Sequence, residues 1–326
     1  ITPSSSLAES MEGYLKKPCS DMIHFKTKYG IDQMLSPEHR MLIHDKKSKT
    51  GKWVVSSAQE MQERHDCIKT GIKVRKSRDS VGFYSAACPA VYTREWGDGL
   101  PLTEEQLRVQ VAVIADGHFP GNTLHCVVRL KKQRKIERLR TLLLAAGIAF
   151  TVLTPEYASA KGFQVFKFYA PMHCKFFGPE FYSCSKAQID VIYDEVLHWD
   201  GTIRKGNRFG EFTTTNKNSA DFIQAVFNSK GHVARVLQDN RADKYNDGIC
   251  YSVNIREARD GLLQYYATTS NTVSSCASTD GYKYCFTVPT SFLLFRRNGC
   301  VFASGNTGKS CSVAWAADYL LTKKVI

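Results

Sequence analysis

The chain has 326 residues, a hydrophobic fraction of 43% and a formal net charge of +13 at pH 7. This length allows two domains with real cores, and no run approaches the roughly 20 apolar residues of a membrane-spanning helix. The 11 cysteines form no Cys-x-x-Cys pair and no Cys/His group at zinc spacing. Their odd count, in a chain without a signal peptide, predicts reduced thiols and a cytoplasmic protein.

The first 103 residues are predicted to be rich in β-strands. Residues 25–35 alternate roughly between apolar and polar side chains, and residues 53–55 begin another strand. Between them, the spacing Ser36-x-x-His39 precedes the apolar residues 41–43. Taken alone, His39 is as readily an ordinary turn histidine as a catalytic one.

A helix-length apolar run at residues 109–117 ends in Asp116-Gly117. It is followed by a predicted strand, a lysine and a second helix closed by glycine, at residues 124–130, Lys132, 136–146 and Gly147. A carboxylate at a helix C-terminus faces the unfavourable end of the helix dipole. A bound cation is the commonest reason for such a placement.

The same order of elements recurs later in the chain. A run at 193–201 ends in Asp200-Gly201, and a strand, a lysine and a glycine-closed helix follow at residues 209–215, Lys217, 219–229 and Gly231. Asp116 and Asp200 lie 84 residues apart, as do Gly147 and Gly231. One Asp-Gly pair alone would be a helix ending in a turn, but two in register predict two pseudo-symmetric subdomains.

A basic cluster follows the first strand. Residues 129–140 hold seven Lys/Arg against one Glu, which suits a polyanionic partner. Alone, the cluster would equally be a solvated helix face.

The last part of the chain is again predicted to be β-rich. Residues 271–280 are predicted as a Ser/Thr-rich linker, and strands are predicted at 282–288 and at 292–295. Asn298-Gly299 then predicts a hairpin turn before a strand at 300–304.

The paired Asp-Gly runs resemble the two signature helices of the LAGLIDADG homing endonucleases. The resemblance implies that Asp116 and Asp200 bind Mg²⁺ over the scissile phosphates of double-stranded DNA, that the strands form a saddle over the DNA, and that Lys132 and Lys217 are active-site lysines. In such a site carboxylates hold the cation while lysines offset phosphate charge. The DNA-binding residues would be Arg129, Lys131, Arg134, Lys135, Arg138 and Arg208.

The flanking segments resemble an intein, a protein-splicing element with a Hint domain. Ser36-x-x-His39 is similar to the motif whose histidine polarises the upstream splice junction, and Tyr284-x-x-Thr-Val, the hairpin and Asn306-Thr307 are similar to the last two intein blocks. Asn306 would cyclise and break the chain, and Thr307 would be the nucleophile that accepts the upstream flank.

Several positions depart from the intein pattern. The first splicing nucleophile would lie upstream of Ile1, so the N-terminal splicing and flanking segments are expected to be missing. Gly305 replaces a frequent histidine. Cys285 stands where many inteins have Asp, and is either an auxiliary residue polarising Thr307 or a buried strand cysteine. Met41 occupies the place of a tryptophan found in one intein subclass.

The residues after Thr307 form half of a P-loop. Gly308-Lys309-Ser310 and a helix at 311–324 match its second half, but Ala303 stands where its first glycine is required. An upstream host segment would supply the glycines after splicing, so that ATP binds only to the spliced host. The helix at 312–320 resembles that of phage helicases of the Swi/Snf type.

Together these resemblances imply a mixed fold, in which a β-rich Hint (intein) domain is split by an α+β LAGLIDADG endonuclease of two pseudo-symmetric αββα-type repeats. The expected domains are residues 1–103 with a connector from 62, the endonuclease at 104–267, the linker and second Hint part at 268–306, and host sequence at 307–326. We expect a phage-encoded monomer acting in the cytoplasm of a bacterial host. The alternatives are an endonuclease with decayed splicing, a P-loop ATPase or helicase fragment, and a non-catalytic DNA-binding module.

Overall fold

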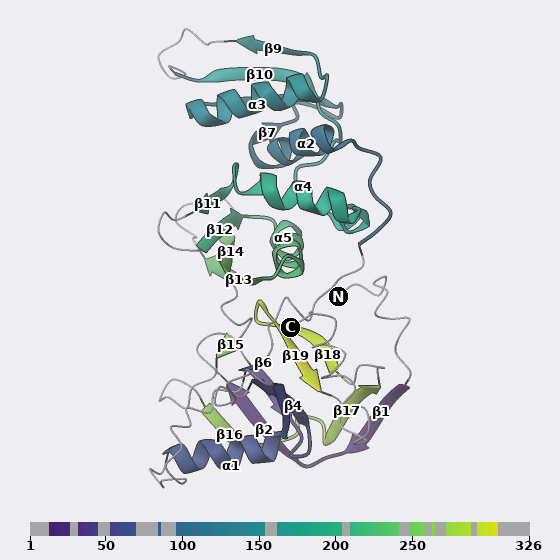
Figure 1. Cartoon of the computed structure of the whole chain (residues 1–326), viewed down its shortest axis with the longest axis vertical. Coiled ribbons are helices and arrows are strands. Elements are labelled where there is room, and N and C mark those ends of the chain that lie inside the picture. The colour runs from purple at the N-terminus through teal and green to yellow at the C-terminus, as the bar shows by residue number, and fades with distance from the viewer. Residues whose placement is uncertain are drawn as a thin grey trace. The chain divides into compact units, whose positions relative to one another are not determined.

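The computed structural model describes residues 13–26, 32–44, 53–69, 84–85, 96–153, 162–203, 209–240, 248–257, 263–264, 272–287 and 292–305. The chain divides into two compact units (Figure 1). The framework unit comprises residues 1–93, 228–235 and 257–326, and the repeat unit comprises residues 94–227 and 236–256. Within the described residues, no helix combines the length and the apolar character that crossing a membrane requires.

The framework unit is assembled from both ends of the chain. Strand β1 (Gly13–Pro18) pairs antiparallel with β17 (Tyr282–Thr287). Strand β2 (Asp21–Lys26) lies between β3 (Asp32–Leu35) and β16 (Thr272–Ala277). The linker predicted at 271–280 is therefore wrong for residues 272–277, because β-branched Thr272 and Val273 begin a strand and Val273 packs into the core.

The other framework elements are short. Strand β4 (Arg40–His44) pairs with β5 (Trp53–Ser57), and β6 (Tyr84–Ser85) pairs with β15 (Leu263–Gln264). Helix α1 (Ala58–Lys69) occupies part of the stretch predicted as a connector. Its start has the reciprocal bonds of a capping box, because Glu60 N–H donates to Ser57 Oγ and Ser57 N–H donates to Glu60 Oε2.

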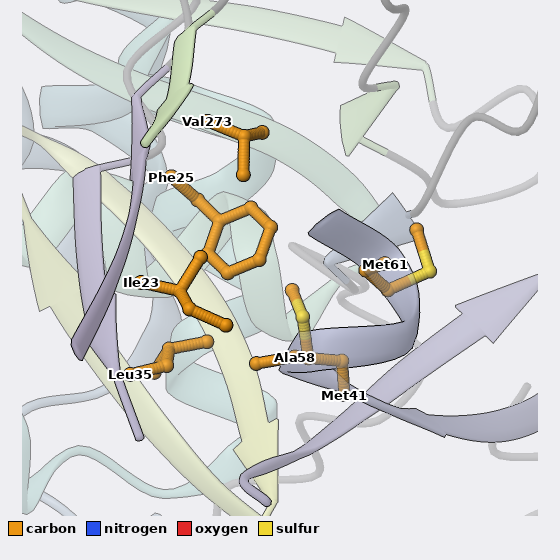
Figure 2. Close-up of a cluster of buried hydrophobic side chains, with 7 residues drawn as sticks. All are labelled: Ile23, Phe25, Leu35, Met41, Ala58, Met61 and Val273. Carbon is orange, nitrogen blue, oxygen red and sulfur yellow. The ribbon is translucent and has the colours of Figure 1, made fainter. Parts of the chain in front are cut away.

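Apolar side chains from four strands and α1 form the core of this unit. Figure 2 shows the cluster, in which Val273 of the C-terminal segment lies beside residues of the N-terminal segment. The cluster consists of Ile23, Phe25, Leu35, Met41, Ala58, Met61 and Val273. Its burial joins the two ends of the chain into one core.

The predicted hairpin near the C-terminus is confirmed. Strands β18 (Phe292–Arg297) and β19 (Cys300–Gly305) pair antiparallel with Arg297 opposite Cys300. Asn298 and Gly299 between them have φ of 50° and 71°. Positive φ at both central residues is the requirement of the tight turns that favour Asn-Gly.

The repeat unit, together with residues 228–235 and 257 that complete its last helix and strands, contains the same arrangement twice. The first repeat runs α2 (Glu104–Asp116), β7 (Gly117–His118), β8 (His125–Leu130), α3 (Gln133–Ala145), β9 (Phe150–Leu153) and β10 (Gln164–Tyr169). After the 3-10 turn η4 (Pro179–Ser183), the second runs α4 (Lys186–Val196), β11 (Gly201–Ile203), β12 (Phe209–Thr214), α5 (Lys217–Ser229), β13 (His232–Asn240) and β14 (Ile249–Glu257). The strand orders, β7-β8-β10-β9 and β11-β12-β14-β13, are equivalent. Each repeat thus adds two strands to the αββα pattern that the sequence predicts.

Helices α2 and α4 pack against each other (Figure 1). Each begins at a capping box, formed by Thr103 with Gln106 and by Ser185 with Gln188. Residues 109–114 of α2 are all buried, as expected for a helix covered on every side. The predicted helix ends at Gly147 and Gly231 are confirmed by positive φ at both glycines.

Candidate functional site

The two repeats bring Asp116 and Asp200 to one site. Asp116 is the last residue of α2, and Asp200 follows α4 and precedes β11. Burial raises the pKa of Asp200, and the negative charge of Asp116 raises it further. The two carboxylates are therefore close enough to repel each other, which is an arrangement that a bound cation relieves.

One lysine pairs directly with Asp116. Nζ of Lys135, on α3, lies 2.5 Å from Asp116 Oδ2. The same ammonium lies 5.6 Å from the centre of the Trp199 ring. Lys135 is buried, so its charge acts in a medium of lower dielectric than water.

A second lysine caps the end of α2. Lys175 Nζ donates to the carbonyl oxygens of Val113 and Ile114, at 2.8 and 2.7 Å. Burial lowers the pKa of Lys175, while Asp116 and Asp200 are among the groups whose charges raise it. The ammonium thus lies in the field of both acids and at the negative end of the helix dipole.

Among the described contacts, neither predicted active-site lysine reaches Asp116 or Asp200, and their role stays a prediction. Lys132 is the exposed N-cap of α3, and Lys217 Nζ pairs with Asp221 Oδ2 at 2.6 Å within α5. The lysines that the structure places at the acids are Lys135 and Lys175. Lys175 follows β10, in the segment between the two repeats. A lone lysine among apolar residues is common in sequences, so this pattern does not identify Lys175 as a site residue.

Three of the six predicted DNA-binding residues contact the protein itself. Arg134 Nη1 donates to His198 O at 2.6 Å, Lys135 pairs with Asp116, and Arg138 donates twice to the buried Glu195. Arg129 and Lys131 are exposed, and Lys131 Nζ lies 5.7 Å from the Phe163 ring. Arg208 lies outside the described residues.

The sheet of the first repeat has one open, positively charged face. On β8 the buried Cys126, Val128 and Leu130 alternate with His125, Val127 and Arg129. The register places Lys167 of β10 opposite Val127, and hence on the same face as Arg129. The described residues of this face include these two cations and no carboxylate; the others are His118, His125, Val127, Thr151, Leu153, Tyr169 and Val165, of which only Val165 is buried.

The donor set at the acids fits a hard divalent cation. Within the described residues, no three His, Cys, Asp or Glu side chains form a group that could hold a metal ion. A pair of carboxylates nevertheless suits Mg²⁺, which usually binds one or two carboxylates and takes its other ligands from water and substrate phosphates.

The framework unit contains a second polar cluster, around the turn between β3 and β4. His39 N–H donates to Ser36 O at 2.9 Å, and His39 O accepts from Ala58 N–H at 2.8 Å. Burial, with the charge of adjacent Arg40, lowers the pKa of His39 to about 4. The hydroxyl of Ser36 is buried and has no hydrogen-bond partner among the residues that the structure describes.

Residues of β17 and β19, from the C-terminal part of the chain, lie close to Arg40, which follows this turn. The buried Cys285 of β17 is close enough to Arg40 to interact with it electrostatically. A side chain at Gly305 would overlap the carbonyl oxygen of Arg40, so β19 passes directly against β4 there. Four residues singled out in the sequence, Ser36, His39, Cys285 and Gly305, therefore lie on or beside one short segment. Asn306, Thr307, Gly308, Lys309 and Ser310 lie outside the described residues.

No family model and no curated protein match the chain. Among solved structures, it is similar to full-length DUF199/WhiA from Thermatoga maritima, with TM-score 0.34 and 9% identity over 50% of this chain and 54% of that one. It is also similar to mesophilic variants of the homing endonuclease I-DmoI, with TM-score 0.33 and 12% identity over 48% of this chain and 90% of that one. I-DmoI in complex with DNA and Mn matches with TM-score 0.32 and 11% identity, over 47% and 89% of the two chains.

Proposed function

We propose that the repeat unit is a LAGLIDADG-type homing endonuclease that makes Mg²⁺-dependent, site-specific double-strand cuts in DNA. The observation that carries the proposal is the meeting of Asp116 and Asp200, one from each repeat, beside Lys135 and Lys175. Two carboxylates facing a phosphate backbone would weaken a pure DNA-binding module, so their presence at this site favours a nuclease.

The chemistry follows from the charges at the site. Asp116 and Asp200 would hold the cation, which when bound activates water and stabilises the charge that develops at the phosphate. Lys175 is fixed by the α2 carbonyls and supplies positive charge to the same region. Lys135 neutralises Asp116 when the cation is absent. Arg129 and Lys167 on the open sheet face would contact backbone phosphates.

The test is a cleavage assay with Mg²⁺, a duplex that encodes an uninterrupted P-loop, and a pool of randomised duplexes. Asp116→Asn and Asp200→Asn should each lower cleavage at least about a hundredfold, since the cation contributes several kcal/mol, and should leave DNA binding intact. Lys175→Met should lower turnover in the same way. Lys217→Met is the matched control, because Lys217 pairs with Asp221.

The outcomes separate the competing functions. Unchanged cleavage in Asp116→Asn would remove the metal assignment. Binding of DNA without cleavage by the parent chain would favour a non-catalytic module, and ATP binding by this chain would favour the ATPase fragment.

We further propose that the framework unit is a protein-splicing domain, excised at Asn306–Thr307. The supporting observation is the convergence of His39, Cys285 and Gly305 around Arg40. The orphan hydroxyl of Ser36 suits a peptide donor from the upstream junction, since buried polar groups are normally paired. Mg²⁺ would serve only the nuclease, and ATP only the spliced host.

Release of residues 307–326, followed by mass spectrometry, tests this second function. Asn306→Ala should block release because it removes the amide that cyclises. Gly305→Ala should slow release, because its methyl group would overlap Arg40 O. Gly121→Ala is the control, since a methyl group there meets nothing within 4 Å. An intact parent chain would indicate decayed splicing, and release from Asn306→Ala would exclude Asn306 as the scissile residue.

A further inference from the structure

The two acids are anchored differently. Helix α2 continues as far as Asp116, whereas α4 ends at Val196, four residues before Asp200. The intervening residues form a turn in which His198 N–H donates to Glu195 O and Trp199 N–H donates to Val196 O. Asp200 therefore lacks the regular helical hydrogen bonds that fix the backbone of Asp116.

A buried carboxylate lies at the base of this turn. Glu195 is 0% exposed, and its Oε1 accepts from Trp199 Nε1 and from Arg138 Nε, both at 2.7 Å. Its Oε2 accepts from Arg138 Nη2 at 2.6 Å and from Arg108 Nη1 at 3.1 Å. Arg108, Arg138 and Trp199 belong to α2, α3 and the turn itself, so one carboxylate joins three elements.

These bonds keep Glu195 ionised. Burial alone would raise the pKa of Glu195, but the hydrogen bonds from Arg138, Trp199 and Arg108 and the charge of Arg138 outweigh it, so that the pKa is lowered. Trp199 is 3% exposed and directly precedes Asp200. Because the Trp199 ring is buried and its N–H is bonded to Glu195, the backbone of the next residue, Asp200, has little freedom to move.

We propose that Glu195 is a positioning residue, which holds the turn carrying Asp200 through its bond to Trp199 and thereby replaces the helical turn that α4 lacks. Arg138 holds Glu195 in place through two short bonds, Arg108 adds one longer bond, and neither arginine acts on the substrate. The inference rests on the proposed nuclease function, because it assigns a purpose to the placement of Asp200.

The decisive variant is Trp199→Phe, which removes the N–H donor and keeps an aromatic ring. We expect Mn²⁺ binding, measured by electron paramagnetic resonance without DNA, to weaken about tenfold, the size of one hydrogen bond to a charged group. Turnover should fall by a similar factor, while KM for DNA and the salt dependence of binding stay unchanged. Trp96→Phe is the matched control.

A second variant separates positioning from stability. Arg108→Met removes only the longest bond to Glu195 and keeps both Arg138 bonds and the Trp199 bond. It should therefore lower the melting temperature and leave Mn²⁺ affinity and turnover at the parental values. Parental Mn²⁺ affinity and turnover in Trp199→Phe would overturn the proposal.

Hydrogen exchange keeps this inference distinct from the nuclease proposal. If the parent chain neither binds Mn²⁺ nor cuts DNA, the nuclease proposal fails. In that case faster amide exchange at residues 197–201 in Trp199→Phe, but not in Arg108→Met, would still support the positioning role, and unchanged exchange would overturn it.

Discussion

His39 lies where its imidazole is held neutral, with a pKa of about 4 in the folded protein against about 6.5 in the unfolded chain. Between these values the unfolded chain binds more protons than the folded one, so stability rises with pH. Lowering the pH from 7 to 5 should therefore cost the framework unit up to about 2 kcal/mol. Urea unfolding at the two pH values measures this loss.

His39→Gln should remove most of that pH dependence, whereas His118→Gln, which alters an exposed histidine of the other unit, should not. An identical pH dependence in the parent and in His39→Gln would place the titrating group elsewhere.

The sequence predicts the two candidate acids, but not that Lys135 and Lys175 are the lysines beside them. The repeat spacing singles out Asp116 and Asp200 because a helix-ending Asp-Gly recurs in register. The 84-residue spacing that relates the two acids does not predict which lysines lie beside them. Lys132 has an extended backbone as the N-cap of α3, and the lysine at Asp116 is Lys135, one turn further along. Lys175 comes from a loop outside the repeated pattern.

At the scale of the elements, the open face of the first sheet predicts how DNA affinity depends on salt concentration. Each phosphate contact contributes a slope of about −0.9 to the dependence of log affinity on log salt for duplex DNA. Arg129→Gln and Lys167→Gln should each reduce the magnitude of that slope by about 0.9. Fluorescence anisotropy over a range of salt concentrations measures the slope.

Arg140→Gln is the matched control, with the same change in charge. The Arg140 guanidinium lies over the ring of Phe166, a buried residue of the opposite sheet face. Equal slopes for all three variants would mean that the open face does not contact DNA.

Sequence patterns predicted some elements better than others. The hairpin at Asn298-Gly299 and the helix ends at Gly147 and Gly231 follow from residues that tolerate positive φ. The strands β9, β10, β13 and β14 were missed, although each repeat needs them to complete its sheet. In β10 the burial pattern is irregular, with Val165 and Phe166 both buried, so the alternation that marks a half-exposed strand is weak.

For the whole molecule, pairing between distant strands decides the architecture. The sequence predicts β-rich segments at both ends, but the pairing of β1 with β17 and of β2 with β16 depends on side chains meeting across the chain. Phe25 and Val273 face each other in that register, and both enter the same core. No local periodicity carries such information, since it describes which face is apolar and not which partner covers it.

This pairing has a consequence for synthesis on the ribosome. Strand β2 has β3 on one side, but β16, its other neighbour, is translated only after the entire repeat unit. At about 5–20 residues per second, the free edge of β2 waits on the order of 10 to 50 s while the repeat unit emerges and folds. An unpaired edge is a template for wrong strand pairing. The framework unit therefore cannot complete its core until the whole repeat unit has been translated, although its strands β2 and β3 are made before that unit.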